Sequence, residues 1–280
     1  MDRGREKVHP RECVDEVFRV LTTSKKIWIP FILAGIISVI FLAIEIIFRE
    51  FYLKDIIMDA SGYFMIMGFN LGSVLFHSLL SLLIIPSYLL MYDSISKYRE
   101  PSFRKAFVKG LKYYPKLMLA YLIMFIITTV LSGILNISYT IFINILGIDL
   151  VHDFGYDLFI TGSVDIPIMI LTMLYLVLFL VVYQSIVLGK KGALKGIEES
   201  VRVGFRNYLP LLNLLFFFTM FRFLLRYILN IIELFHDDQV WLLLLLNVLM
   251  VPLVAFIGIF STLVYTSFYL KYKKIERSGS

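Results

Sequence analysis

The sequence is poor in charged residues and in cysteine. Only 17% of its 280 residues are charged, whereas 59% are hydrophobic. Because a soluble domain needs a polar exterior, this composition excludes an ordinary soluble globule and indicates that lipid is part of the solvent. The single cysteine, Cys13, excludes a disulfide within the chain. We expect a reduced thiol that packs in the protein, with a reactive thiol as the alternative.

The sequence also lacks the short motifs that carry common chemistries. There is no phosphate-cradling loop of the Walker type, no G-x-S-x-G, no histidine-rich zinc motif and no cysteine pair. We therefore expect no catalytic residues, no cofactor and no enzymatic activity. The first 26 residues are polar and no A-x-A-like site follows the first apolar run, so we expect no cleavable signal peptide.

Long apolar runs are the dominant feature. Six of them span residues 27–48, 64–91, 115–146, 166–188, 208–235 and 240–270. A helix needs about 20 apolar residues to cross about 30 Å of hydrocarbon. The runs are too long and too uniformly apolar for barrel strands. The sequence therefore predicts an all-α, polytopic bundle of six transmembrane helices forming one membrane domain over residues 1–280.

Basic residues mark one side of this bundle. Of the 27 Lys and Arg residues, 23 lie in residues 1–26, 97–116, 190–206 and 271–277, whereas residues 147–165 contain none. Basic loops stay cytoplasmic. We therefore expect a multi-pass protein of the cell membrane with both termini in the cytoplasm. Because the positive charge is explained by topology, it does not imply a nucleic-acid partner.

A weak internal repeat accompanies this pattern. Pro30, Pro115 and Pro210 each stand at the start of an apolar run. An aromatic residue and a basic residue precede each proline, and these six residues are expected at the membrane surface: Lys26, Trp28, Lys112, Tyr114, Arg206 and Tyr208. The prolines predict three units, approximately 11–96, 97–189 and 190–275, each with one amphipathic helix followed by a transmembrane hairpin.

The amphipathic helices are predicted from apolar residues at i, i+3, i+4 and i+7. The expected apolar faces consist of Cys13, Val14, Val17, Phe18 and Leu21; of Phe103, Ala106, Phe107, Gly110, Leu111 and Tyr114; and of Leu194, Ile197, Val201, Gly204, Phe205 and Tyr208. Such a helix lies on the inner leaflet with its basic face toward anionic lipid, or packs against the bundle, and one helix can do both.

The stretch from Gly189 to Ser200 carries a resemblance to a known family. It has the form Gly-x-x-Ala-x-x-x-x-x-x-Ser and leads through a basic-aromatic turn into an apolar run. With the three units, it resembles the membrane domain that precedes the catalytic domain in some glycerophosphodiester phosphodiesterases, and related six-span prokaryotic families of uncharacterised function. The predicted bundle occupies the 280 residues, so we expect no catalytic barrel among them, and the resemblance implies a membrane module and no hydrolase residue.

Charged residues within the apolar runs are the candidate ligand-binding site, because burial in lipid is costly for them. Arg222 and Arg226 share one helical face and lie about 18 and 24 Å along their helix from Pro210. Glu45 lies about 22 Å along its helix from Pro30. The equal depths predict that Glu45 lies opposite one of the arginines.

Three interpretations of these charges remain open. They form an internal ion pair without a ligand, they bind an anion such as a lipid phosphate, or Glu45 couples to protons together with His77, the histidine within the second run. Two arginines against one central carboxylate leave a positive charge that favours an anion or a wet pocket. Glu233 is expected nearer the outer surface.

An acidic loop offers a weaker candidate. Asp149, His152 and Asp153 have the spacing of one helical turn, which suits a divalent metal ion. A solvated acidic loop without metal is the simpler interpretation.

The sequence thus supports three hypotheses of function. The first is a non-enzymatic scaffold or a module that binds membrane lipids or another membrane protein. The second is a transporter or lipid-handling protein with an anion-binding cavity near Glu45, Arg222 and Arg226. The third is a membrane-embedded enzyme. A cavity at the arginines would favour the second hypothesis over the first.

Overall fold

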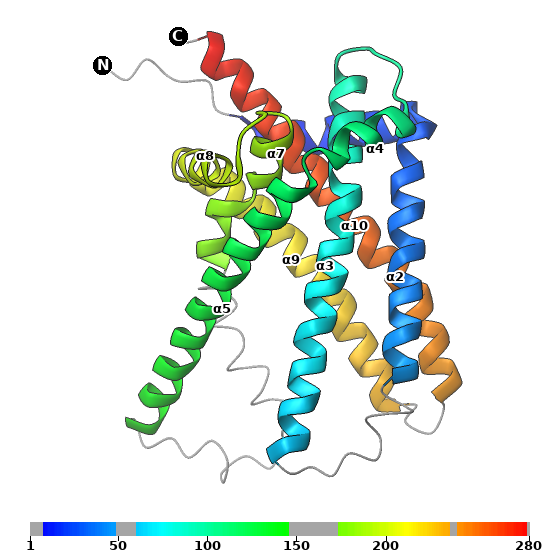
Figure 1. Cartoon of the computed structure of the whole chain (residues 1–280), viewed down its shortest axis with the longest axis vertical. Helices are drawn as coiled ribbons and strands as arrows, with labels where there is room; N and C mark the ends of the chain where they lie inside the picture. The colour runs from blue at the N-terminus through cyan, green and yellow to red at the C-terminus, as the bar shows by residue number, and fades with distance from the viewer. Residues whose placement is uncertain (1–7, 49–59, 146–172, 236–239, 279–280) are drawn as a thin grey trace.

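The computed structural model describes residues 8–48, 60–145, 173–235 and 240–278, and within these ranges it is helical without strands. The long helices are α2 (Trp28–Phe48), α3 (Ala60–Ser96), α5 (Tyr114–Ile145), α9 (Tyr208–Phe235) and α10 (Val240–Ser278). They extend from the region of α4 and α8 toward the opposite end of the molecule (Figure 1). The prediction of an all-α bundle is confirmed for these residues.

Three shorter helices gather at one end of the bundle. They are α1 (Pro10–Thr23), α4 (Phe103–Leu111) and α8 (Ala193–Arg206), and the C-terminal end of α10 lies at this same end (Figure 1). A 3-10 turn, η1 (Lys25–Ile27), follows α1, and the chain bends by 100° there before it enters α2. Each short helix is therefore followed by a long helix: α2, α5 or α9.

Hydropathy identifies membrane-compatible helices among the described residues. Three segments are long and apolar enough to cross a bilayer: Ser78–Ser96, Tyr114–Leu131 and Tyr208–Leu225. The bent pair formed by α1 and the start of α2 is a fourth if it is counted as one span. These helices make the fold compatible with a membrane protein.

The fourth apolar run is not one uninterrupted helix. Residues 173–176 are helical, η3 (Val177–Phe179) is a 3-10 turn, Leu180 and Val181 form a turn, and α7 (Val182–Val187) follows. An expected helix over residues 166–188 is therefore wrong for this part of the run; residues 166–172 lie outside the described ranges. The sequence carries no Gly/Pro signal at the break.

The hydroxyl of Ser200 explains how the break is tolerated. Its Oγ accepts a hydrogen bond from the backbone N–H of Val181 (3.2 Å) and donates one to the carbonyl of Leu178 (2.9 Å). A buried backbone group without a partner is costly, and these two bonds supply partners that the helix itself lacks. One side chain of α8 thus supports both sides of the interruption.

The buried face of α8 differs from the predicted one. It consists of Ala193, Gly196, Glu199, Ser200, Val203 and Gly204. Leu194 and Phe205, which belong to the predicted apolar face, are each 68% exposed. A Cβ at Gly204 would lie 2.8 Å from the Cα of Leu178. Small residues therefore face the bundle because the helix approaches another backbone, which leaves the large apolar side chains outside.

Candidate functional site

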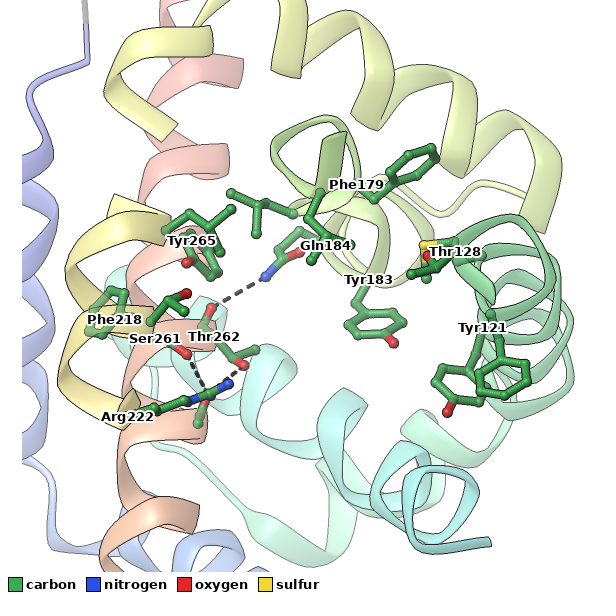
Figure 2. A pocket seen from close by; sticks show the side chains of 17 residues that line it. Tyr121, Thr128, Phe179, Tyr183, Gln184, Phe218, Arg222, Ser261, Thr262 and Tyr265 are labelled. Atoms are coloured by element: carbon green, nitrogen blue, oxygen red, sulfur yellow. Dashed lines mark hydrogen bonds between the residues drawn. The ribbon is translucent and has the colours of Figure 1, made fainter. Parts of the chain in front are cut away.

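A cavity of about 380 Å³ lies between α5, the interrupted fourth segment, α9 and α10. Figure 2 shows the side chains around it. The polar or amphipathic residues among them are Tyr121, Thr128, Tyr183, Gln184, Thr219, Arg222, Ser261, Thr262 and Tyr265. Phenylalanine, leucine and methionine side chains make up most of the remaining wall. The volume lies within the range of small-molecule binding sites.

Arg222 is the charged residue among those that line the cavity. It lies on α9, and its guanidinium occupies the space beside Gly258 of α10: a Cβ at Gly258 would lie only 3.2 Å from Nη2 of Arg222. Within the described residues, no carboxylate forms an ion pair with this guanidinium. Because residue 258 is a glycine, the guanidinium of Arg222 has room beside α10 on the cavity wall.

Two hydroxyls of α10 share an acceptor next to this guanidinium. Ser261 Oγ and Thr262 Oγ1 both donate to the carbonyl oxygen of Gly258, each at 2.8 Å. Their hydroxyl protons are therefore directed at their own helix, and their oxygen lone pairs remain to accept hydrogen bonds. Figure 2 shows both residues near Arg222.

Gln184 of α7 brings an unsatisfied polar atom to the same wall. Its Nε2 donates to the carbonyl of Thr262 and to Oγ1 of Thr266, both at 3.3 Å. The residue is only 1% exposed, and its Oε1 has no partner among the described residues. A buried acceptor without a partner costs about 1–3 kcal/mol. A bound molecule that carries a hydroxyl or amine would recover that cost.

The composition of this wall suits the binding of an anionic amphiphile. A guanidinium recognises phosphate or carboxylate with two parallel hydrogen bonds, and the aromatic and aliphatic wall suits hydrocarbon. Within the described residues there is no group of three or more His, Cys, Asp or Glu side chains that could hold a metal ion. The cavity can therefore accommodate an anionic headgroup with part of an apolar chain.

The structure describes the helices of the other predicted site residues but does not describe their side chains. Glu45 lies on α2, His77 on α3, and Arg226 and Glu233 on α9. Their side chains are outside the part of the structure that is described, so a pair of Glu45 with an arginine stays a prediction. The loop with Asp149, His152 and Asp153 lies outside the described residues altogether.

Two of the predicted surface aromatics make specific bonds at helix corners. Trp28 Nε1 donates to the carbonyl of Leu21 (3.0 Å), which ties the start of α2 to α1. The hydroxyl of Tyr208 donates to the carbonyl of Leu174 (2.8 Å), which ties the start of α9 to the interrupted segment. Tyr114 is the first residue of α5. The first bond joins α1 to the bundle, and the second joins two segments of the bundle.

The predicted basic residues at these corners are exposed. Nζ of Lys26 lies 3.9 Å from Oε2 of Glu100, and Lys112 directly follows the last residue of α4. Nη1 of Arg206 donates a hydrogen bond to the hydroxyl of Tyr272 at 3.1 Å. Surface ion pairs such as that of Lys26 contribute little to stability. Their positions at the ends of α1, α4 and α8 are compatible with a role at the membrane surface.

A second polar cluster, which the sequence did not predict, surrounds Glu199. Glu199 of α8 has a side chain only 5% exposed, and its Oε1 lies 2.6 Å from Nζ of Lys273 and 3.2 Å from Nζ of Lys191. Tyr269 donates to its other oxygen at 3.1 Å. Burial alone would raise the pKa of Glu199, but hydrogen bonds to its carboxylate, foremost that from Lys273, outweigh burial and lower that pKa. The carboxylate is thus held in its charged form.

Comparison of the chain with protein-family models, with curated proteins and with solved structures finds no match. The resemblance to the membrane domain of glycerophosphodiester phosphodiesterases therefore stays a prediction.

Proposed function

We propose that this protein is a non-enzymatic, lipid-handling membrane protein that binds an anionic amphiphile in the cavity beside Arg222. The observation that carries this proposal is a guanidinium exposed to a largely apolar cavity, with no described carboxylate to neutralise it. A pure scaffold would instead bury its central arginine in a packed, paired interior. The cavity thus favours lipid handling over the scaffold hypothesis.

We also propose six membrane spans in three units, with both termini in the cytoplasm. The charge bias supports the orientation. Trp28, Tyr114 and Tyr208 are each the first residue of a long helix, and a buried apolar residue follows three positions later in every case: Phe31, Leu117 and Leu211. The aromatics therefore align the units better than the prolines, which stand one or two positions later.

The two outer short helices add support for the repeat. α1 and α8 each have 14 residues. When their first residues are aligned, the buried Cys13, Val17, Val20 and Leu21 of α1 coincide with the buried Gly196, Ser200, Val203 and Gly204 of α8. A unit of this kind fits the membrane module that the resemblance implies.

Native mass spectrometry tests the lipid site. Phosphatidylglycerol or phosphatidylcholine is titrated into protein held in a mild neutral detergent, and the bound lipid is counted. We expect a preference for phosphatidylglycerol that Arg222→Gln weakens about tenfold, since a charge-assisted hydrogen bond contributes about 1.5–3 kcal/mol. Gly258→Ala, which crowds the guanidinium, should weaken binding in the same direction.

Arg202→Gln is the matched control, because Arg202 is an exposed arginine of α8 that pairs with Glu198. It should leave the lipid preference unchanged. Equal binding of both lipids by the wild-type protein, or an unchanged preference in Arg222→Gln, would contradict the proposed function.

A further inference from the structure

A second hollow, of about 860 Å³, lies at the end of the bundle where α4 and α8 lie. The C-terminal end of α3, the α7–α8 loop, α4 and the last turns of α10 contribute to its lining. Eight of the lining residues are Lys or Arg, and three are carboxylates: Asp93, Glu199 and Glu276. We call this hollow the basic cleft. It contains no residue of the cavity beside Arg222.

Each of the three carboxylates forms an ion pair with a neighbouring lysine. Asp93 pairs with Lys97 at 2.6 Å. Glu199 and Glu276 both pair with Lys273, at 2.6 and 2.5 Å. The excess of cations in the basic cleft is therefore not cancelled by its own acids.

Four cations of the cleft have no such partner. Arg99, Lys109, Lys190 and Lys274 form no ion pair with any described carboxylate. They come from three separate parts of the chain: the segment after α3 together with α4, the α7–α8 loop, and the end of α10. Like charges brought together by the fold repel one another, and a multivalent anion relieves that repulsion.

The α7–α8 loop places Lys190 by close backbone packing. A Cβ at Gly189 would lie 2.4 Å from the carbonyl oxygen of Ser185 and 2.7 Å from Oη of Tyr269, so only glycine fits there. Lys190 itself has a φ of 55°, the left-handed conformation that long side chains rarely adopt. Residues held in such conformations are frequent at ligand sites. The strain here positions an unpaired lysine on the rim of the basic cleft.

We infer that the basic cleft binds an anion that carries phosphate groups. Ammonium and guanidinium groups are the usual partners of phosphate oxygens, and the cleft has the volume of a small-molecule site. The buried carboxylate of Glu199 pairs with the half-buried Lys273, and this pair links α8 to α10 at the lining of the cleft. The same chemistry is offered by a phosphorylated lipid headgroup and by a soluble phosphate compound. This site is separate from the proposed lipid cavity and does not depend on it.

Paired variants in two binding measurements test this inference. The cleft variant is Lys190→Gln with Lys274→Gln; the control is Lys105→Gln with Lys195→Gln, which removes two exposed lysines outside the cleft. One arm titrates sodium pyrophosphate into detergent-solubilised protein by calorimetry. The other titrates phosphatidic acid and follows it by native mass spectrometry. Arg222 is unchanged throughout, so its cavity contributes equally to each variant.

We expect the cleft variant, and not the control, to bind at least about tenfold more weakly, as the loss of two charge-assisted contacts implies. A loss in the pyrophosphate arm identifies a soluble phosphate as the ligand class, and a loss confined to phosphatidic acid identifies a lipid headgroup. If the cleft and control variants bind alike in both arms, or if neither anion binds the wild-type protein, the inference is overturned.

Discussion

At the scale of single residues, Glu199 and Lys273 form a short ion pair, with 2.6 Å between Oε1 and Nζ. The pKa values of both groups shift in the direction that favours the charged ion pair. Burial would lower the pKa of Lys273, but its hydrogen bonds to Glu199 and Glu276 outweigh that effect and raise it. The pKa of Glu199 is lowered in turn. The pair therefore links α8 to α10 as long as both charges are present.

Glu199→Gln should lower the free energy of unfolding in detergent by about 2–3 kcal/mol, because it leaves Lys273 with one carboxylate less in a half-buried position. Thermal unfolding measures the change. Glu198→Gln is the control, since Glu198 is the adjacent residue and its side chain is 68% exposed. Equal losses in the two variants would show that burial of the carboxylate is unimportant.

The same pair predicts a window of pH in which it stabilises the fold. Because folding lowers the pKa of Glu199, its charged form stabilises the fold at pH values above 4.5, the ordinary pKa of the group. That stability is lost as the pH falls through the pKa of the folded state. Because folding raises the pKa of Lys273, its charged form stabilises the fold fully at pH values below 10.5, the ordinary pKa of the group. That stability is lost as the pH rises through the pKa of the folded state. Unfolding temperature should be high between these limits, with a shallower acid limb in Glu199→Gln.

At the scale of elements, α8 presents three faces with different surroundings. The small residues face the bundle, Leu194 and Phe205 are exposed apolar side chains, and Lys195, Glu198 and Arg202 form a charged face. An apolar surface that is exposed beside a membrane-compatible bundle suits contact with lipid. The helix thus packs on the protein through one face and leaves a separate apolar face exposed.

Gly204→Ala tests the close approach of α8 to the interrupted segment. The new Cβ would lie 2.8 Å from the Cα of Leu178, so a backbone must move. We expect a loss of about 1–2 kcal/mol in detergent, as overpacking outweighs the gain in helix propensity. Gly35→Ala in α2 is the control, because a Cβ there meets nothing within 4 Å. It should be neutral or stabilising, and a similar loss in both would refute the packing argument.

At the scale of the whole molecule, topology is the property that decides how both proposed sites can be reached. Cys13 is a free, buried thiol, and burial raises its pKa to about 11, so it is protonated at neutral pH. The wild-type protein should therefore react slowly with maleimides. This makes it a suitable background for introduced cysteines.

Lys105→Cys and Asp157→Cys report on the two sides of the membrane. In intact cells, a membrane-impermeant maleimide should label the second variant only, and lysis should expose the first, as the charge bias predicts. The unsubstituted protein should remain unlabelled in both conditions. Labelling of Lys105→Cys from outside would reverse the proposed orientation, and labelling of both in intact cells would contradict six spans.

Much of the architecture was readable from the chain, and the errors are instructive. The run over residues 208–235 became α9 with the same bounds, because lipid requires long apolar helices and hydropathy reports them directly. The prediction of one helix over the fourth run was wrong because apolar composition does not reveal a break in a helix. The backbone groups at this break are bonded by Ser200, a residue of the following helix α8. Arg222 was found since a charge among apolar residues is conspicuous, whereas Gly258 and Gln184 carry no such signal.

What the sequence determined by itself is therefore the class of fold, the bounds of most long helices and the presence of a charged group among apolar residues. These follow from local quantities: the hydropathy of a segment, its length and the position of its charges. The tertiary structure alone decided which face of α8 is buried, where Arg222 finds space beside Gly258, and that Glu199 meets Lys273. Each of these depends on the distance between segments far apart in the chain, and periodicity within one segment contains no information about its neighbour.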